Sequence, residues 1–239
     1  MASAMRPFDS ARRDLLRLSS VGLAASAAAT LPAFAAAPRK GVAVPATPTL
    51  FDVRTFGATG DGKTVDSPAI NRAIEAAAAA GGGTVIFPAG NYVSFSIRLK
   101  SHVNLYLSQG CTIIAAESPL PGQTTGYMGG TYDAAEPNSA WEAYQDWGHN
   151  HWRNSLLWGD GISDFSITGP GLLWGKGLSF GADRPARGAY PKYVAEQPGV
   201  GNKTIGLRNC HNVVLRDFSI LKGGHFGILF TGVDNLTVD

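Results

Sequence analysis

The run from Trp141 to Asn154, WEAYQDWGHNHWRN, is the sequence's densest group of side chains able to bind a ligand. Within it His149, His151, Trp152 and Arg153 follow one another almost without interruption. An aromatic ring can stack on the apolar face of a sugar, and a cation can neutralise a carboxylate. The run therefore suits a ligand that has both an apolar face and a carboxylate, such as a sugar acid. The alternative is structural, with the tryptophans packing a loop and the histidines making internal hydrogen bonds.

Two further features of the histidines concern binding. His149 and His151 have the His-x-His spacing of a ligand pair, but no third ligand lies at a suggestive spacing. We therefore predict no metal site and no cofactor. His225, in the sequence GGHFG, is expected in the turn before the last strands. Substrate contact and ordinary loop hydrogen bonds both fit this histidine.

The elements that must position these side chains begin with one helix. Ser67 supplies a capping hydroxyl, and Pro68 occupies the first helical position. Glycines at 81–83 end the helix, so the pattern predicts a helix over 67–80 and a strand after it. Its apolar face is narrow and rich in small side chains at helical spacing: Ile70, Ala73, Ile74 and Ala77.

A repeat follows the helix. Four apolar positions recur at one constant interval, from Ile205, Cys210, Val213 and Leu215 to Ile228, Val233, Leu236 and Val238. A shift of about twice that interval toward the N-terminus, taken as two further periods, finds Leu157, Ile162, Phe165 and Ile167. Turn-forming residues keep their place in each copy: Asp164, Asn212 and Asn235. One strand–turn–strand unit per copy is typical of a solenoid.

We therefore predict an all-β fold, a right-handed single-stranded parallel β-helix with the helix at 67–80 as its N-terminal cap. A leucine-rich repeat has a similar period, but it needs a helical segment and a denser leucine frame in each copy. The pattern stops partway through a repeat at Asp239, so we expect the solenoid to be C-terminally incomplete.

The first 35 residues have the features of an export signal. Arg12 and Arg13 precede an uncharged, alanine-rich stretch, and Ala33-Phe34-Ala35 provides a cleavage site. A membrane anchor is the alternative, but the stretch is alanine-rich and Pro32 interrupts it. We predict a twin-arginine signal peptide at 1–35, a linker at 36–50 and a β-helix domain at 51–239. The mature protein would be periplasmic or secreted, without a membrane segment.

Composition excludes several classes of protein. With 44% hydrophobic residues the chain is not a disordered tail, and with two cysteines it is not a disulfide scaffold. The net charge of +2 comes from the first 35 residues, so no nucleic-acid partner is expected. Cys210 occupies an inward apolar position of the repeat, and this favours a buried free thiol over a disulfide with Cys111.

Two stretches carry a family resemblance. Residues 51–92, beginning FDVRTFGATGDGKTVDSPAI, resemble the opening segment of pectin-degrading β-helix enzymes. Residues 207–213, LRNCHNV, resemble the coils of polygalacturonase-like proteins, glycoside hydrolase family 28. The resemblance implies inverting hydrolysis of galacturonic acid links, with two carboxylic acids roughly 6.5–9.5 Å apart. It also implies pectic polysaccharide or oligogalacturonide as the partner, no cofactor, and a monomer at full length. A polysaccharide lyase on this scaffold and a non-catalytic carbohydrate-binding β-helix are the alternatives.

The catalytic motifs of that family are absent from the sequence. It contains no Asn-Thr-Asp triplet, no Asp-Asp pair and no Gly-His-Gly. Arg98-Leu99-Lys100 matches the family's Arg-x-Lys motif in spelling, but it precedes the expected catalytic coils. We assign no catalytic residue, expect the acids C-terminal to Asp239, and expect the 239-residue chain alone to be inactive.

Overall fold

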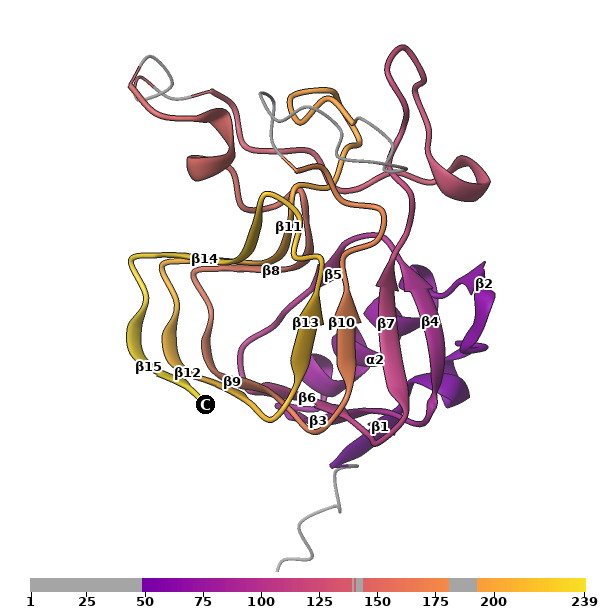
Figure 1. The fold of residues 1–239 in the computed structure, drawn as a ribbon. Coiled ribbons are helices and arrows are strands. Elements are labelled where there is room, and N and C mark those ends of the chain that lie inside the picture. The colour runs from indigo at the N-terminus through magenta and orange to yellow at the C-terminus, as the bar shows by residue number, and fades with distance from the viewer. Residues whose placement is uncertain (1–48, 139, 141–143, 181–192) are drawn as a thin grey trace, which may run out of the picture. The chain divides into compact units, whose positions relative to one another are not determined.

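The computed structural model describes residues 49–138, 140, 144–180 and 193–239 (Figure 1). The predicted signal peptide lies outside the described residues, and so does the predicted linker except for its last two residues. The first strand, β1 (Leu50–Asp52), begins at the last of these. No helix in the described part of the chain has the length and apolar character needed to cross a bilayer.

Three parallel sheets, which we call A, B and C, form the described structure (Figure 1). Sheet A consists of β1 (Leu50–Asp52), β3 (Gly83–Phe87), β6 (Val103–Leu107), β9 (Ser163–Thr168), β12 (His211–Arg216) and β15 (Asp234–Val238). Sheet B consists of β2 (Asp61–Val65), β4 (Gly90–Ser94), β7 (Cys111–Ala115), β10 (Leu172–Trp174) and β13 (Ser219–Leu221). Sheet C consists of β5 (Ile97–Arg98), β8 (Ser155–Asp160), β11 (Lys203–Arg208) and β14 (Phe226–Thr231).

The chain visits the sheets in a fixed order, from C to A to B and then to C again. Each strand pairs in parallel with the strand one coil earlier, as β11 pairs with β8 and β14. This is the predicted right-handed parallel β-helix. A coil contains three strands, however, where the repeat pattern predicted one strand–turn–strand unit.

The interval from Ile205 to Ile228 is one coil, because these two residues are register partners. The longer interval from Leu157 to Ile205 is also one coil, since these residues pair directly as well. Our interpretation of it as two periods was wrong. A long insertion between β10 and β11 extends this coil by an amount close to a coil length.

Helix α2 (Ser67–Ala79) lies between β2 and β3, where later coils place a strand of sheet C. Its buried side chains include all four of the predicted apolar positions. The helix has Asp66 as its N-cap, one residue before the predicted one. The Ser67 hydroxyl accepts a 2.7 Å hydrogen bond from the backbone N–H of Phe95, so it joins the helix to the solenoid instead of capping it.

The core is a stack of side chains from equivalent positions of successive coils. In sheet A, Val85, Leu105, Ile167 and Leu215 are successive register partners and are almost completely buried. At the turn into this sheet, Asn212 Nδ2 donates to Asp164 Oδ1, and Asn235 Nδ2 donates to Asn212 Oδ1, both at 2.7 Å. This amide ladder satisfies side-chain polar groups between coils.

The two cysteines also belong to the interior. Cys111 and Cys210 are both buried and both free, as the inward position of Cys210 in the repeat predicted. Burial raises the pKa of the Cys111 thiol to about 12, so this side chain behaves as a small apolar group.

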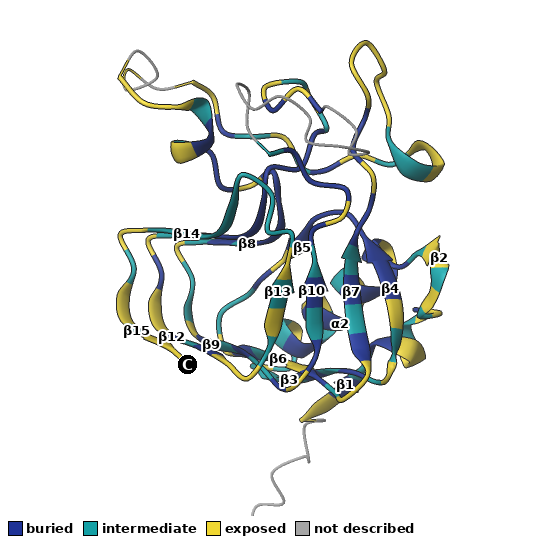
Figure 2. Ribbon diagram, viewed as in Figure 1, coloured by how far each residue is buried: buried dark blue, intermediate teal, exposed yellow. Residues whose placement is uncertain are grey.

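Two long insertions interrupt the coils, and both lie between sheet B and sheet C. The first runs from 116 to 154 and carries the short helices η2 (Tyr127–Gly129) and η4 (Trp147–His149). The second runs from 175 to 202. Their described parts project from one end of the strands, with buried bases and exposed tips (Figures 1 and 2).

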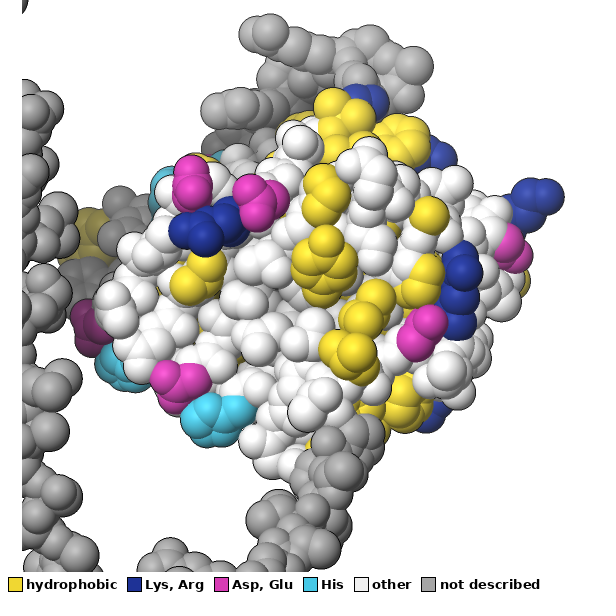
Figure 3. Space-filling view, turned by 90° about the horizontal axis from the view of Figure 1, so that it is seen from below, with side chains coloured by type: hydrophobic (Ala, Val, Ile, Leu, Met, Phe, Trp, Pro, Cys, Tyr) yellow, Lys and Arg dark blue, Asp and Glu magenta, His cyan; other side chains and the backbone are white. Residues whose placement is uncertain are grey.

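The outer face of sheet A is different in character. Seen from below, this side of the molecule shows hydrophobic side chains together with scattered charged side chains and histidines (Figure 3). Its histidines form simple surface pairs: His102 Nδ1 lies 3.6 Å from Asp164 Oδ2, and His211 Nδ1 lies 3.1 Å from Asp234 Oδ2. The insertions, on another side of the solenoid, are the better place to look for a functional site.

Candidate functional site

The candidate site is the place where coils pass from sheet B to sheet C, which we call the B–C corner. It consists of the described parts of residues 116–154 and 175–202 and of the short turn 222–225. Because both insertions and the turn join the same two sheets, the coil stack places them next to one another. Side chains far apart in the sequence therefore meet at this corner.

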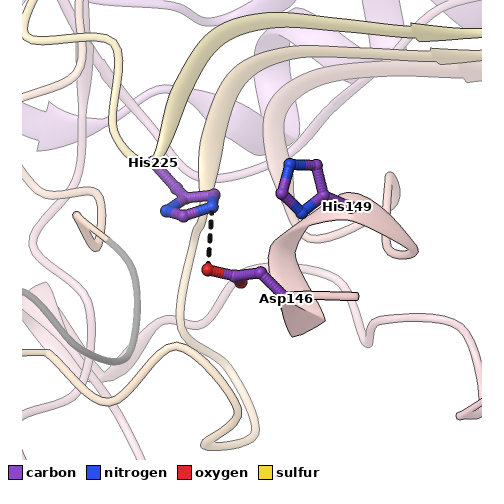
Figure 4. Close-up of side chains that lie close together, drawn as sticks. All are labelled: Asp146, His149 and His225. Atoms are coloured by element: carbon purple, nitrogen blue, oxygen red, sulfur yellow. Dashed lines mark ion pairs between the residues drawn. The ribbon is translucent and has the colours of Figure 1, made fainter. Parts of the chain in front are cut away.

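His225 meets the first insertion there (Figure 4). Its Nε2 atom lies 3.5 Å from Asp146 Oδ2, and its side chain is only 9% exposed. The His149 ring lies across that of His225 with centroids 5.9 Å apart. A ligand atom from each of Asp146, His149 and His225 lies within 4.8 Å of the others. Two of our predicted site residues thus lie together.

His151 and Trp152 lie at the base of the insertion instead. His151 is fully buried, stacks on the Trp147 ring at 3.9 Å, and places Nδ1 2.7 Å from the Trp147 carbonyl. Trp152 is 8% exposed, and the Arg208 guanidinium lies over its ring at 5.0 Å. The positions of these two side chains agree with the alternative that they pack the loop, because neither ring has an exposed face on which a sugar could stack.

Arg153 is the exposed cation of the run. Its side chain is 45% exposed and lies between Asp160 Oδ2, at 3.4 Å, and Glu136 Oε1, at 3.8 Å. Hydrogen bonds from Arg208 and then from Arg153 hold the pKa of Asp160 below its usual range. Arg153 therefore has the reach to contact a ligand while its acidic neighbours orient it.

Sequence reasoning missed Lys203, at the start of β11. The residue is fully buried, and its ammonium donates to the His151 carbonyl at 2.5 Å and to Asn202 Oδ1 at 3.1 Å. Burial lowers the pKa of Lys203 to about 7, with Glu136 and Asp146 acting in the opposite direction. One signal in the sequence could have identified it: Lys203 lies one coil length before Phe226, the residue with which it pairs, and so occupies a position of the repeat that is apolar in the next coil.

Several buried polar atoms flank Lys203 without a hydrogen-bond partner in the described part of the chain. They come from the starts of β8 and β11 and the residues just before them: Asn154 Oδ1, Ser155 Oγ, Asn202 Nδ2 and Thr204 Oγ1. Buried donors and acceptors of this kind are normally satisfied by ordered water or by a ligand. The base of the corner is therefore polar and suited to hydroxyl groups.

A groove of about 410 Å³ runs along the outer face of sheet B below the corner. Its lining includes Trp174, Lys63 and Lys176. The ammonium groups of Lys176 and Lys222 lie 5.9 and 6.0 Å from the centre of the Trp174 ring. These cations suit a chain of sugars that carries carboxylates, and Glu117 Oε1, which lies 3.3 Å from Lys176 Nζ, orients one of them.

Arg98, of the Arg-x-Lys sequence, has a structural partner. Its guanidinium donates to both carboxylate oxygens of Asp133, at 2.6 and 2.8 Å. Trp158 Nε1 donates to the same carboxylate at 2.8 Å. These contacts join the first insertion to sheet C, which agrees with a coincidental match to the motif.

Comparison with known proteins adds the family context. Residues 50–143 match the family described as rhamnogalacturonase A/epimerase, pectate lyase-like. An exo-poly-alpha-D-galacturonosidase of Dickeya chrysanthemi is 24% identical over 222 residues, which cover 80% of this chain and 35% of that protein. An alginate lyase of Azotobacter vinelandii is 60% identical over 42 residues, 18% of this chain and 5% of that protein. The chain thus spans about a third or less of the length of these relatives.

Among solved structures, the family 28 exopolygalacturonase of Yersinia enterocolitica superposes with a TM-score of 0.57 at 22% identity. The match covers 79% of this chain and 38% of that one. At this identity the likeness establishes the fold, and the chemistry must be argued from the corner itself.

Proposed function

Because this chain is a polygalacturonase-like β-helix protein of the pectate-lyase-like type, we propose that it contributes the N-terminal coils of a glycoside hydrolase acting on pectic polysaccharide. Its role is to bind the uronic acid chain. The sheet B groove holds sugars over Trp174 between lysines, and the B–C corner receives the end of that chain. Arg153 contacts the sugars there, with His149 and His225 beside it and with His151 and Trp152 beneath.

The observation that carries this proposal is the continuity of the groove with the corner. Ala116 and Lys176, which line the groove, are the first residue of the first insertion and the second residue of the second insertion. A polyanion lying along the lysines therefore reaches the insertions without crossing another sheet. The cations neutralise its carboxylates, and the exposed guanidinium of Arg153 offers two parallel donors to one of them.

The two acids of the reaction are placed, in this proposal, in coils that stack on β14 and β15. The family's acid motifs do not occur in the sequence, and the Dickeya relative is about three times as long as the matched part. A strand added to sheet B after β15 would bring its following turn onto the turn 222–225. Carboxylic acids in that turn would face His225 and the first insertion.

A binding measurement tests the contribution of these coils. Trigalacturonate is titrated into the 239-residue chain by calorimetry, and Arg153→Ala is expected to weaken binding by about tenfold, since a charge-assisted pair is lost. Arg216→Ala, which removes an arginine of sheet A paired with Asp239, is the matched control and should leave affinity unchanged. Equal affinities for wild type and Arg153→Ala would contradict the assignment of Arg153.

The activity is tested with a protein extended beyond Asp239 on polygalacturonate. New reducing ends without ultraviolet-absorbing unsaturated products support hydrolysis. Unsaturated products support the second candidate, a lyase, which the match of a short segment to an alginate lyase favours. Binding without either product indicates a carbohydrate-binding β-helix. Turnover by the 239-residue chain alone would show that the acids are placed wrongly.

Export belongs to the same proposal. The arginine pair and the Ala33-Phe34-Ala35 site support cleavage after residue 35 and a location outside the cytoplasm. Expression with Arg12 and Arg13 both replaced by lysine should leave uncleaved precursor in the cytoplasm. Unchanged cleavage in a host whose twin-arginine route is disabled would contradict that route.

A further inference from the structure

We propose that Asp146, His149 and His225 bind a divalent transition-metal ion of the Zn²⁺ class, which fastens the first insertion to the turn before β14. The three residues come from two segments that the coil stack brings together, and their ligand atoms lie within 4.8 Å of one another (Figure 4). Two imidazoles and one carboxylate are a ligand set that zinc accepts, with a fourth position left for water.

The geometry is close to that of an occupied site. Zinc bonds of about 2.0–2.1 Å in a tetrahedral arrangement separate neighbouring ligand atoms by roughly 3.3 Å. Asp146 Oδ2 and His225 Nε2 are already 3.5 Å apart. His149 lies in the short helix η4 and is exposed, so a rotation of its side chain can close the remaining distance.

The orientation of His225 is the second observation. Its Nδ1 atom lies 3.4 Å from the Phe180 carbonyl, and a carbonyl oxygen can only accept a hydrogen bond. A proton on Nδ1 leaves a lone pair on Nε2. That atom is buried, has no hydrogen-bond partner in the described part of the chain, and points at the Asp146 carboxylate. Two acceptors facing each other repel, and a metal cation between them removes the repulsion.

The surroundings of each ligand resemble the outer shell of known metal sites. Metal-binding histidines commonly donate their other ring N–H to a backbone carbonyl, as His225 does in this arrangement. Asp146 Oδ1 accepts a 2.8 Å hydrogen bond from the Gly148 backbone N–H, which leaves Oδ2 directed at His225. The pair His149-x-His151 considered from sequence does not form the site, because His151 packs on Trp147.

The test is a zinc titration of the untagged 239-residue chain after treatment with a chelator, followed by calorimetry and by competition with a chromophoric chelator. One zinc ion per chain is expected, and Co²⁺ should give the visible absorption of a tetrahedral complex. Asp146→Asn and His149→Ala should each weaken binding more than about tenfold. His102→Ala and His211→Ala remove histidines that lie in simple surface pairs with aspartates, and they should bind zinc as the wild type does.

The main rival is a protonated His225 paired with Asp146 and no metal. In that case zinc would not raise the melting temperature of the wild type, and His149→Ala would behave as the wild type does. Either result overturns the proposal. Circular dichroism of each variant shows whether it is folded, and the zinc-dependent melting shift is measured only on folded protein. No sugar is present, so the outcome does not depend on the proposed hydrolase function.

Discussion

The Lys203 ammonium donates a 2.5 Å hydrogen bond to the backbone carbonyl of His151, which lies 52 residues earlier in the chain. A strand of sheet C thus supports the base of the first insertion from inside. The same burial lowers the pKa of this lysine to about 7, because the charged form loses its hydration.

Lys203 should make stability depend on pH. An unfolded lysine titrates near pH 10.4, so between about pH 7 and 10 the unfolded chain binds more protons than the folded one. The free energy of unfolding should therefore rise with pH, at up to about 1.4 kcal/mol per unit. Lys203→Met should remove most of that rise in urea unfolding. The exposed Lys63→Met is the control, and an identical slope in wild type and Lys203→Met would contradict a depressed pKa.

The amide ladder gives a second prediction. Asn212 has a φ of 54° and makes side-chain hydrogen bonds in both directions along the stack. Asn212→Ala should destabilise the chain by about 2–4 kcal/mol, because it loses both bonds and because alanine tolerates the left-handed region less well than asparagine does. Asn212→Gly also loses both bonds, but glycine adopts this backbone conformation without strain. Its free energy of unfolding should therefore lie between those of the wild type and Asn212→Ala. A lower melting temperature for Asn212→Gly than for Asn212→Ala would contradict this explanation.

Asp133 gives a third prediction, concerning the attachment of the first insertion. It accepts from Arg98 and Trp158, and its own N–H donates to Ser96 Oγ at 3.0 Å. Since Arg98 is half-exposed, Asp133→Ala should lower stability by only about 1–2 kcal/mol but should speed proteolysis within the insertion. Glu75→Gln, which removes an exposed pair with Lys100, is the control. Equal cleavage rates would show that the insertion is held elsewhere.

Gly148 gives a fourth prediction. A Cβ at this position would lie 2.5 Å from His225 Cδ2, so Gly148→Ala should push η4 away from the turn 222–225. Overpacking of this kind costs about 1–3 kcal/mol, and amide hydrogens of residues 144–154 should exchange faster. Gly227→Ala meets Ile220 only at 4.0 Å and serves as the matched control. Unchanged exchange in Gly148→Ala would mean that η4 does not rest on His225.

The length of an uninterrupted coil, the N-terminal helix and the turn residues could be predicted from the sequence, because each is encoded locally, whereas the three strands of a coil were not. Ile205 and Ile228 recur at the length of an uninterrupted coil, and Asn212 and Asn235 mark its turn. The coil that contains Leu157 was misjudged for a physical reason. Its insertion makes it about twice as long as an uninterrupted coil, and hydrophobic periodicity cannot distinguish such an insertion from another coil.

The site was only partly predictable. His149 and His225 were predicted from the sequence as candidate binding residues, but their meeting depends on the stacking of coils that are far apart in the sequence. Trp152 has the residue type of a sugar-stacking platform, yet Arg208 covers it. Lys203 was missed because a lysine at the start of a strand is usually solvated, and here an insertion encloses it.

Both insertions join sheet B to sheet C, and the strand register on either side of them is continuous. The length of the segment that connects the two sheets at this corner therefore does not affect the strand pairing. The coils pair in the same way whether the connection has a few residues or several dozen. Foreign segments could accordingly be grafted between β10 and β11, and substrate preference could diverge among paralogues, without any need to redesign the stacked interior.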